Sequence, residues 1–139
     1  MRTSPRFRFA ILPVLVSCVA MAAQDSQNEK LDRQYQSAVA QYEAGKYSEA
    51  AAQLETLLPH APDSFAIREL MGLAYASLGQ DSKALDHLQA AVRIKPDSAE
   101  ARTNLAATLS HAGKAELAGE QFRKALALEP ENLAAQSSP

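Results

Sequence analysis

Residues 65–98, FAIRELMGLAYASLGQDSKALDHLQAAVRIKPDS, decide the fold of this chain. Gly79 separates two runs rich in Ala and Leu, residues that favour helix, and Pro96 follows the second run. Glycine adopts the left-handed backbone conformation that ends many helices, and proline cannot continue a helix. The stretch therefore predicts two helices that are joined by one tight turn and followed by another.

The same pattern occurs three times at intervals of 34 residues, without a gap. Five columns recur: Gly45, Gly79 and Gly113; Ala50, Ala84 and Ala118; Leu54, Leu88 and Phe122; Leu57, Ala91 and Ala125; Pro62, Pro96 and Pro130. The alanines let paired helices approach closely, and we expect the large apolar column to fill the space beside them. One helix pair cannot bury its apolar face alone, so stacking must make the core. We therefore expect one repeat domain, 31–132, built from units 31–64, 65–98 and 99–132.

The composition predicts an all-α protein with one domain. Of its 139 residues 28 are Ala, whereas only seven residues from Ala23 onward are Val, Ile or Thr, which favour strands. A net charge of −2 offers no basic surface for nucleic acid. One Cys and three His exclude a disulfide framework and a cysteine-rich zinc site.

The first 22 residues have the three parts of a secretory signal peptide. Arg2, Arg6 and Arg8 precede an apolar run, 9–21, which ends in the small-residue motif Ala-Met-Ala at 20–22. The run is shorter than the roughly 20 apolar residues that a membrane-spanning helix needs. We expect export, to a bacterial periplasm, and cleavage after Ala22, which leaves a lead-in of residues 23–30. The mature chain then has 11 basic against 16 acidic residues, a formal charge of −5.

A second processing site competes with this one. Leu15-Val16-Ser17-Cys18 resembles the lipobox of bacterial lipoproteins, in which Cys18 would carry the lipid and anchor the protein in the outer membrane. The residues after Cys18 stay apolar as far as Ala23, which favours ordinary cleavage. The mature domain is not expected to insert into a membrane unless Cys18 is lipidated.

The columns resemble a known repeat family. The third unit has Leu105-Ala106, Leu109, Gly113, Ala118, Phe122, Ala125 and Pro130; the second has Met71-Gly72, Tyr75, Gly79, Ala84, Leu88, Ala91 and Pro96; the first keeps Ala38, Gly45, Tyr47, Ala50, Leu54 and Pro62. This pattern resembles the tetratricopeptide repeat, which implies an α-solenoid of three helix-turn-helix units. The sequence departs from it at Arg68 and Arg102, where the family usually has Trp, and at Ser37 and Gln41, where it prefers large residues.

The resemblance implies a mode of action in which the first helices of successive units line a concave surface that receives a peptide or helix of a partner protein. The lining residues would be Tyr35, Val39, Tyr42, Glu69, Leu73, Glu100, Thr103 and Asn104. Of the positions with which some family members hold a terminal carboxylate, only Asn104 fits, so a carboxylate clamp is not expected. Tyr35 and Tyr42 are candidate anchors for an apolar side chain; the alternative is that Tyr35 packs within the first unit.

The sequence contains no pattern that predicts catalysis. His60, His87 and His111 occupy different positions of the repeat, and no pair of Cys, His or Asp has the spacing of metal ligands. A nucleophile elbow and a phosphate-binding glycine loop are also missing. We expect neither an enzyme nor a cofactor nor a bound metal.

The C-terminal residues leave two functions open. Residues 131–135 begin like another first helix, but residues 133–139 form only a short tail, so apolar residues of the last unit such as Leu117 and Leu128 should be partly exposed. The favoured function is an exported scaffold that binds a protein or peptide. The alternative is a self-associating unit whose last repeat stacks on another copy.

Overall fold

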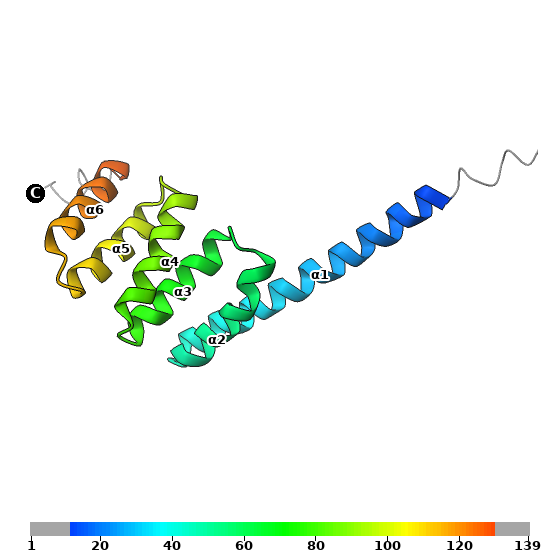
Figure 1. The fold of residues 1–139 in the computed structure, drawn as a ribbon, viewed down its shortest axis with the longest axis horizontal. Coiled ribbons are helices and arrows are strands. Elements are labelled where there is room, and N and C mark those ends of the chain that lie inside the picture. Colours follow the sequence, from blue (N-terminus) through cyan, green and yellow to red (C-terminus); the bar gives the residue numbers. More distant parts are fainter. Residues whose placement is uncertain (1–11, 130–139) are drawn as a thin grey trace, which may run out of the picture. The chain divides into compact units, whose positions relative to one another are not determined.

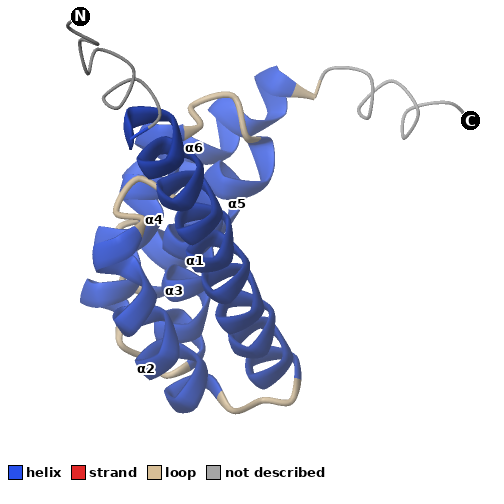
Figure 2. Ribbon diagram, turned by 90° about the vertical axis from the view of Figure 1, so that its right-hand side faces the viewer, coloured by secondary structure: helices blue, strands red, loops and turns tan. Residues whose placement is uncertain are grey.

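The computed structural model describes residues 12–129, and side chains from residue 19 onward. Within this range the chain forms helices and no strand (Figure 2). The helices are α1 (Leu12–Glu43), α2 (Tyr47–Leu57), α3 (Phe65–Ser77), α4 (Asp81–Ile94), α5 (Ala99–His111) and α6 (Ala115–Leu128), with a 3-10 turn, η1 (Leu58–His60), after α2. Helices α3 to α6 lie side by side in chain order (Figure 1). This confirms the predicted all-α solenoid of helix-turn-helix units.

The turn inside each unit is made by the predicted glycine. Gly45, Gly79 and Gly113 have φ angles of 76°, 71° and 77°, in the left-handed region that other residues rarely adopt. In the second unit, the amide of Gln80 donates to the carbonyl of Tyr75 at 2.9 Å, which closes the end of α3. The three glycines therefore end the first helix of each pair.

The turns between units combine a proline with a capping serine. Ser64 precedes α3, and its Oγ accepts a hydrogen bond from the amide of Ile67 at 3.4 Å. Ser98 precedes α5 and accepts from Ala101 in the same way at 3.1 Å. Each serine satisfies an amide that the first turn of the helix leaves without a backbone acceptor.

The two arginines at the usual Trp position also tie these turns together. Nε of Arg68 donates to the carbonyl of Pro62 at 3.1 Å, and Nε of Arg102 donates to the carbonyl of Pro96 at 2.9 Å. The Nη1 atom of Arg102 also donates to Oε1 of Gln121 on α6 at 3.0 Å. Each guanidinium therefore links the inter-unit turn, the first helix and the second helix of its unit.

The core follows the predicted columns in all three units except at one position, since Ala118 and Ala125 of the third unit are buried as predicted. Leu54 and Leu88 are fully buried, whereas Phe122, expected to fill the same space, is 40% exposed. The expectation for Phe122 is wrong because α6 is the last helix among the described residues, and no later helix covers it there. Leu117 and Leu128 are exposed as predicted.

Helix α1 is longer than the sequence suggested, because residues 23–30, expected as a lead-in, are helical. The pattern of residue contacts divides the chain into two compact units, and the boundary lies within this helix. The first unit ends at Gln34, and the second begins at Tyr35 and includes the remaining helices. None of the helices between residues 12 and 129 has the length and apolar character to cross a bilayer. Residues 1–11, the side chain of Cys18, Pro130 and the tail 133–139 lie outside what the structure describes.

Two helical glycines provide a test of the close helix packing. An added Cβ at Gly72 would lie 2.5 Å from Cγ of Leu88 and 3.3 Å from the carbonyl oxygen of Ala84, whereas one at Gly119 would meet only Nη1 of Arg123, at 3.8 Å. We expect Gly72→Ala to lower the free energy of unfolding by about 1–3 kcal/mol through overpacking. Gly119→Ala should raise it by about 0.5–1 kcal/mol, because alanine favours helix. Urea denaturation measures both, and similar changes in the two variants would contradict the packing.

Candidate functional site

The eight predicted lining residues lie on the first helices of the three units. We call them the first-helix surface: Tyr35, Val39 and Tyr42 of α1, Glu69 and Leu73 of α3, and Glu100, Thr103 and Asn104 of α5. Glu100 and Thr103 are exposed, and the other six side chains are half-buried. The surface is therefore accessible enough to bind another molecule, yet most of its side chains are already held by neighbours.

Glu69 lies at the centre of the polar contacts on this surface. Nδ2 of Asn104 donates to its Oε1 atom at 3.3 Å, which connects α3 to α5. Burial raises the pKa of Glu69, and the negative charge of Glu100 raises it further, whereas the Asn104 hydrogen bond and the charge of Lys95 act in the opposite direction. Glu69 is therefore a half-buried carboxylate whose ionised form is further disfavoured by the negative charge of the exposed Glu100.

Tyr35 shares this environment, since burial raises the pKa of its hydroxyl and the charge of Glu69 adds to the effect. The hydroxyl of Tyr35 therefore lies close enough to the second unit for the charge of Glu69 to affect its pKa. Tyr42 has a different position, because its ring packs against Tyr47 of α2, with centroids 5.2 Å apart and planes tilted by 59°. Of the two candidate anchors, Tyr42 is the one with an aromatic contact inside its own unit.

Leu73 lines a pocket of about 250 Å³ between α3 and α5. Ala76 and Ala107 contribute further apolar surface, and Asn104 also borders the pocket. Its far end carries a polar pair that sequence reasoning missed, in which Nδ1 of His111 lies 3.0 Å from Oδ2 of Asp81. Asp81 begins α4 and His111 ends α5, and only the antiparallel packing of these helices brings them together.

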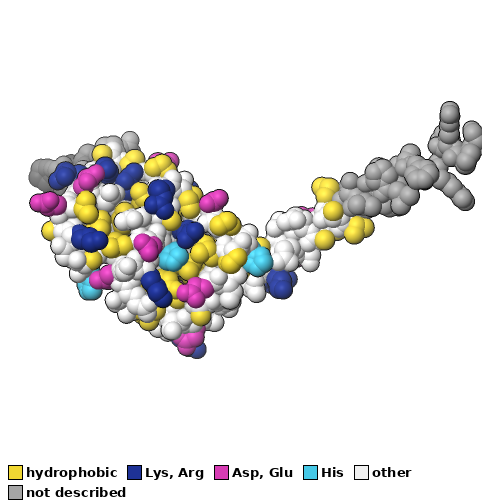
Figure 3. Space-filling model, viewed as in Figure 1, with side chains coloured by type: hydrophobic (Ala, Val, Ile, Leu, Met, Phe, Trp, Pro, Cys, Tyr) yellow, Lys and Arg dark blue, Asp and Glu magenta, His cyan; other side chains and the backbone are white. Residues whose placement is uncertain are grey.

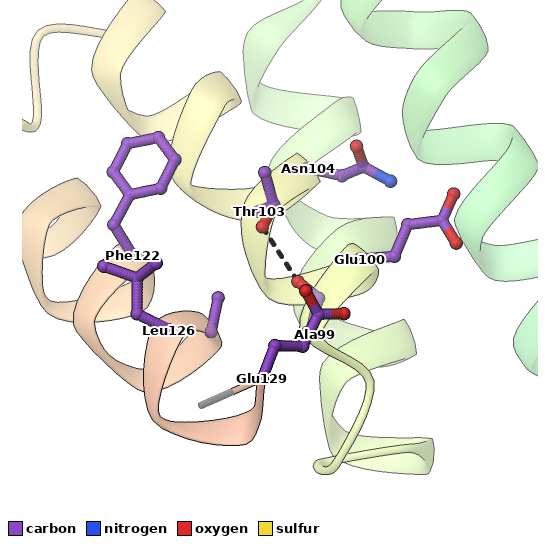
Figure 4. A pocket seen from close by; sticks show the side chains of 8 residues that line it. Ala99, Glu100, Thr103, Asn104, Phe122, Leu126 and Glu129 are labelled. Atoms are coloured by element: carbon purple, nitrogen blue, oxygen red, sulfur yellow. Dashed lines mark hydrogen bonds between the residues drawn. The ribbon is translucent and has the colours of Figure 1, made fainter. Parts of the chain in front are cut away.

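A second and larger groove, of about 420 Å³, lies between α5 and α6. Glu100, Thr103 and Asn104 line it together with Phe122 and Leu126. Figure 4 shows Phe122 and Leu126 on α6 across from Thr103, while Glu100 points away from α6. The hydroxyl of Thr103 donates to the carbonyl of Ala99 in its own helix at 2.9 Å. The wall formed by α6 is apolar, because its lining side chains are Phe122, Ala125 and Leu126.

A polar cluster that the sequence did not predict joins α2, α3 and α4. The hydroxyl of Tyr75 donates to Oε1 of Glu55, and the Tyr75 ring stacks on His87 at 5.7 Å between centroids. Nη1 of Arg68 donates to Nδ1 of His87 at 3.2 Å, and Nζ of Lys83 lies 5.0 Å from the centroid of Tyr75. Burial and the Glu55 contact raise the pKa of Tyr75 to about 12.

The surroundings of His87 favour its neutral form. Burial lowers its pKa and the charge of Arg68 lowers it further, outweighing the opposite effect of Asp86 and Glu55. A neutral imidazole can accept the Arg68 hydrogen bond at Nδ1, whereas a protonated one cannot. The cluster therefore connects three helices, α2, α3 and α4, through side-chain contacts.

Two further observations concern the charged side chains on the surface and the side chains that could bind a metal ion. On the face of the molecule seen in Figure 3, acidic and basic side chains are interspersed and apolar side chains reach the surface between them. Over the part of the chain that the structure describes, no three His, Cys, Asp or Glu side chains lie together as metal ligands would.

The fold is a solenoid of helical repeats, and the first-helix surface is a partly apolar face of it. The tetratricopeptide repeat pattern matches residues 35–99 and 82–132, and the chain belongs to the tetratricopeptide repeat family. No curated protein matches the chain.

Solved structures with the same fold include two proteins. MamA from Desulfovibrio magneticus RS-1, residues 41 to the end, superposes with a TM-score of 0.67 at 26% identity, over 76% of this chain and 57% of that chain. The MamA RS-1 ArsTM double mutant gives a TM-score of 0.70 at 25% identity, over 78% of this chain and 59% of that chain. This chain thus spans about three fifths of the length of these MamA structures. The Yersinia enterocolitica type III secretion chaperone SycD, in complex with a peptide of the translocator YopD, gives a TM-score of 0.70 at 19% identity, over 78% of this chain and 86% of that chain.

The depressed pKa of His87 predicts how stability depends on pH. Its pKa lies below the ordinary 6.5 in the folded protein, so the folded state binds fewer protons than the unfolded state near that pH. The stabilisation from neutral His87 is therefore complete above pH 6.5 and is lost as the pH falls from there toward the lowered pKa. Denaturant titrations across this range should show the free energy of unfolding decreasing with acidity.

The variant His87→Gln isolates this effect, because Gln121 already accepts the equivalent arginine hydrogen bond in the third unit. Glutamine does not titrate, so the loss of stability below pH 6.5 should become smaller in this variant. His60→Gln, at an exposed histidine, serves as the control and should leave the pH dependence unchanged. An unchanged pH dependence in His87→Gln would contradict the role assigned to this imidazole.

Proposed function

We propose that this protein is an exported protein-interaction module that binds a peptide or helix of a partner on the first-helix surface. The observation that carries the proposal is the juxtaposition on α3 and α5 of an apolar pocket at Leu73 with the half-buried pair Glu69 and Asn104. Interfaces commonly combine such an apolar centre with polar groups at the edge. Membership of a family whose members are generally binding modules favours this function over catalysis.

The charge of the surface favours a partner segment that pairs an apolar side chain with a basic one. The charge of Glu100 disfavours the ionised form of Glu69, and a cationic group of the partner beside these two carboxylates would offset this effect. The apolar side chain would enter the pocket at Leu73. SycD, which shares the fold, has been crystallised with a peptide of YopD, which supports the binding of a partner peptide by this architecture.

We place the protein in the bacterial periplasm on the basis of residues 1–22. The three arginines, the apolar run 9–21 and the Ala-Met-Ala motif support cleavage after Ala22, which would leave Ala23 as the first residue of the mature protein. Anchoring in the outer membrane through a lipid on Cys18 is the alternative. The intact mass of the mature protein separates the two, because a diacylglycerol-sized addition on Cys18 would refute the soluble form.

Self-association is a second candidate function, favoured by exposed apolar side chains on α6. Leu117 and Leu126 are each 51% exposed, and Leu128 and Phe122 also reach solvent. Two copies could cover these residues by stacking their last units. Light scattering over a range of concentrations tests this candidate, and a strictly monomeric protein would eliminate it.

Substitutions on the first-helix surface provide the main test of partner binding. With the mature chain as bait in an envelope extract, we expect Leu73→Glu and Tyr42→Ala to reduce capture of the specific partner about tenfold or more, as anchor residues do. Leu117→Glu introduces the same charge at an exposed leucine outside this surface and should leave capture unchanged. Circular dichroism must show the same helix content in all three variants. Undiminished capture by Leu73→Glu and Tyr42→Ala would refute this site.

A further inference from the structure

The groove between α5 and α6 adds a second apolar cavity to the first-helix surface, and the function proposed above does not use it. Phe122 and Leu126 form its apolar wall, and their side chains are 40% and 51% exposed. The residues at the equivalent positions one unit earlier, Leu88 and Val92, are packed into the core. Large apolar side chains that remain exposed in a groove are typical of a binding site for another molecule.

This groove and the pocket at Leu73 belong to one surface, because α5 lines both of them. Asn104 borders both cavities. The α5 residues of the groove lie between Ala99 and Asn104, and those of the pocket lie between Asn104 and His111. At about 1.5 Å per residue, the centres of the two cavities are roughly 9 Å apart along the axis of α5. An extended peptide spans this distance with about three residues.

A polar strip, made by Glu69, Glu100 and Asn104, lies between the two cavities. Figure 4 shows Glu100 and Asn104 pointing to the same side of α5, away from α6. On that side Asn104 donates its hydrogen bond to Glu69 at 3.3 Å, and the charge of Glu100 acts on the same carboxylate. The charge of Lys95 offsets this only in part, since the pKa of Glu69 stays above its ordinary value. A cationic group above the strip would therefore interact favourably with both carboxylates.

The groove has the same sign of charge as the strip. Glu100 and Glu129 line it, and the described residues that form its walls include no lysine or arginine. A basic peptide is therefore complementary in charge to the groove and to the strip. Other possible occupants fit less well: residues 130–139 include one acidic and no basic residue, and a second copy of the chain has a net charge of −2.

On the basis of the function proposed above, we propose that the partner segment crosses α5 in an extended form, with two apolar side chains about three residues apart and a lysine or arginine between them. One apolar side chain enters the pocket at Leu73, and the other packs against Phe122 and Leu126. The basic side chain pairs with Glu69 and Glu100. The surface thus selects its partner by charge as well as by apolar contact.

Peptide selection tests this specificity directly. A phage-displayed library of random peptides is selected on the immobilised full chain and, in parallel, on Leu73→Glu. We expect a consensus with a basic position between two apolar positions, and we expect Leu73→Glu to lose it. A consensus that depends on Leu73 but has no basic position overturns this inference and leaves the proposed function intact. If no consensus depends on Leu73, both are overturned.

Variants of the chain then assign the basic position of the peptide to its site. The probe is the synthetic peptide of the consensus sequence, with the basic residue present or replaced by norleucine. This replacement should lower the affinity for the original chain about tenfold and the affinity for Glu69→Gln/Glu100→Gln much less, as measured by isothermal titration calorimetry. The control Glu49→Gln/Glu116→Gln removes the same charge at two exposed positions of the second helices and should behave like the original chain. Equal losses in the original chain and in Glu69→Gln/Glu100→Gln overturn the charge pairing.

The second apolar position is tested in the same way. Replacing one of the two apolar residues of the peptide by alanine should weaken binding to the original chain several-fold but leave binding to Phe122→Ser unchanged. Leu117→Ser, at an exposed leucine of the same helix, is the control and should respond like the original chain. Both sites are solvent-exposed, so both variants should keep their helix content by circular dichroism. Additive losses in Phe122→Ser for both apolar residues contradict binding in this groove.

Two measurements would assign the groove to another occupant. Deletion of residues 130–139 should leave the affinity for the consensus peptide unchanged, and a several-fold gain would overturn the proposal, because those residues would then compete for the groove. Light scattering that shows a dimer which the peptide dissociates would overturn it as well, since a second copy would then occupy the groove.

Discussion

The structure depends on one constraint: the large apolar residue at the centre of each second helix is covered only in part by its own unit and is completed by the next. Leu88 fits against Gly72 within its unit, so closely that a Cβ at Gly72 would overlap it, and Leu105 of the following unit closes the other side. Phe122, in the last described helix, lacks this second cover and remains 40% exposed. Stability is therefore a property of neighbouring units together, as expected for a solenoid.

The period predicts the parts of this fold that local chemistry determines. Gly79 needs positive φ, Ser98 supplies a capping oxygen, and both requirements follow from the residue type and its place in the repeat. The helical lead-in could have been anticipated, because neither Gly nor Pro interrupts the sequence between Pro13 and Gly45. The exposure of Phe122 depends on what covers α6, which the column of large residues does not reveal.

The candidate site was predictable as a set of positions but not as a set of contacts. The resemblance placed Glu69 and Asn104 on the same face, yet the hydrogen bond between them depends on the stacking of two units. The pair Asp81 and His111 was missed for the same reason, since 30 residues separate them in the sequence. The shape of the first-helix surface therefore depends on how the units pack against one another in the core.

Polar side chains replace the usual aromatic residue at the junctions between units. Arg68 and Arg102 stand at the family's Trp position and hydrogen-bond to the preceding turn instead of filling space. His87 and Gln121 then serve as equivalent acceptors in successive units, one of them able to titrate. The two units thus share one geometry, but only the second has a histidine as the acceptor.

Native-state hydrogen exchange tests the central claim most directly, because it measures how cooperatively each helix is held. If each unit is completed by its neighbours, the amides of α3 and α4, which are packed between α2 and α5, should be the slowest to exchange. Those of α6, whose apolar face is partly exposed, should exchange faster than those of α4. Equal protection of α4 and α6, or greater protection of α6, would contradict the account.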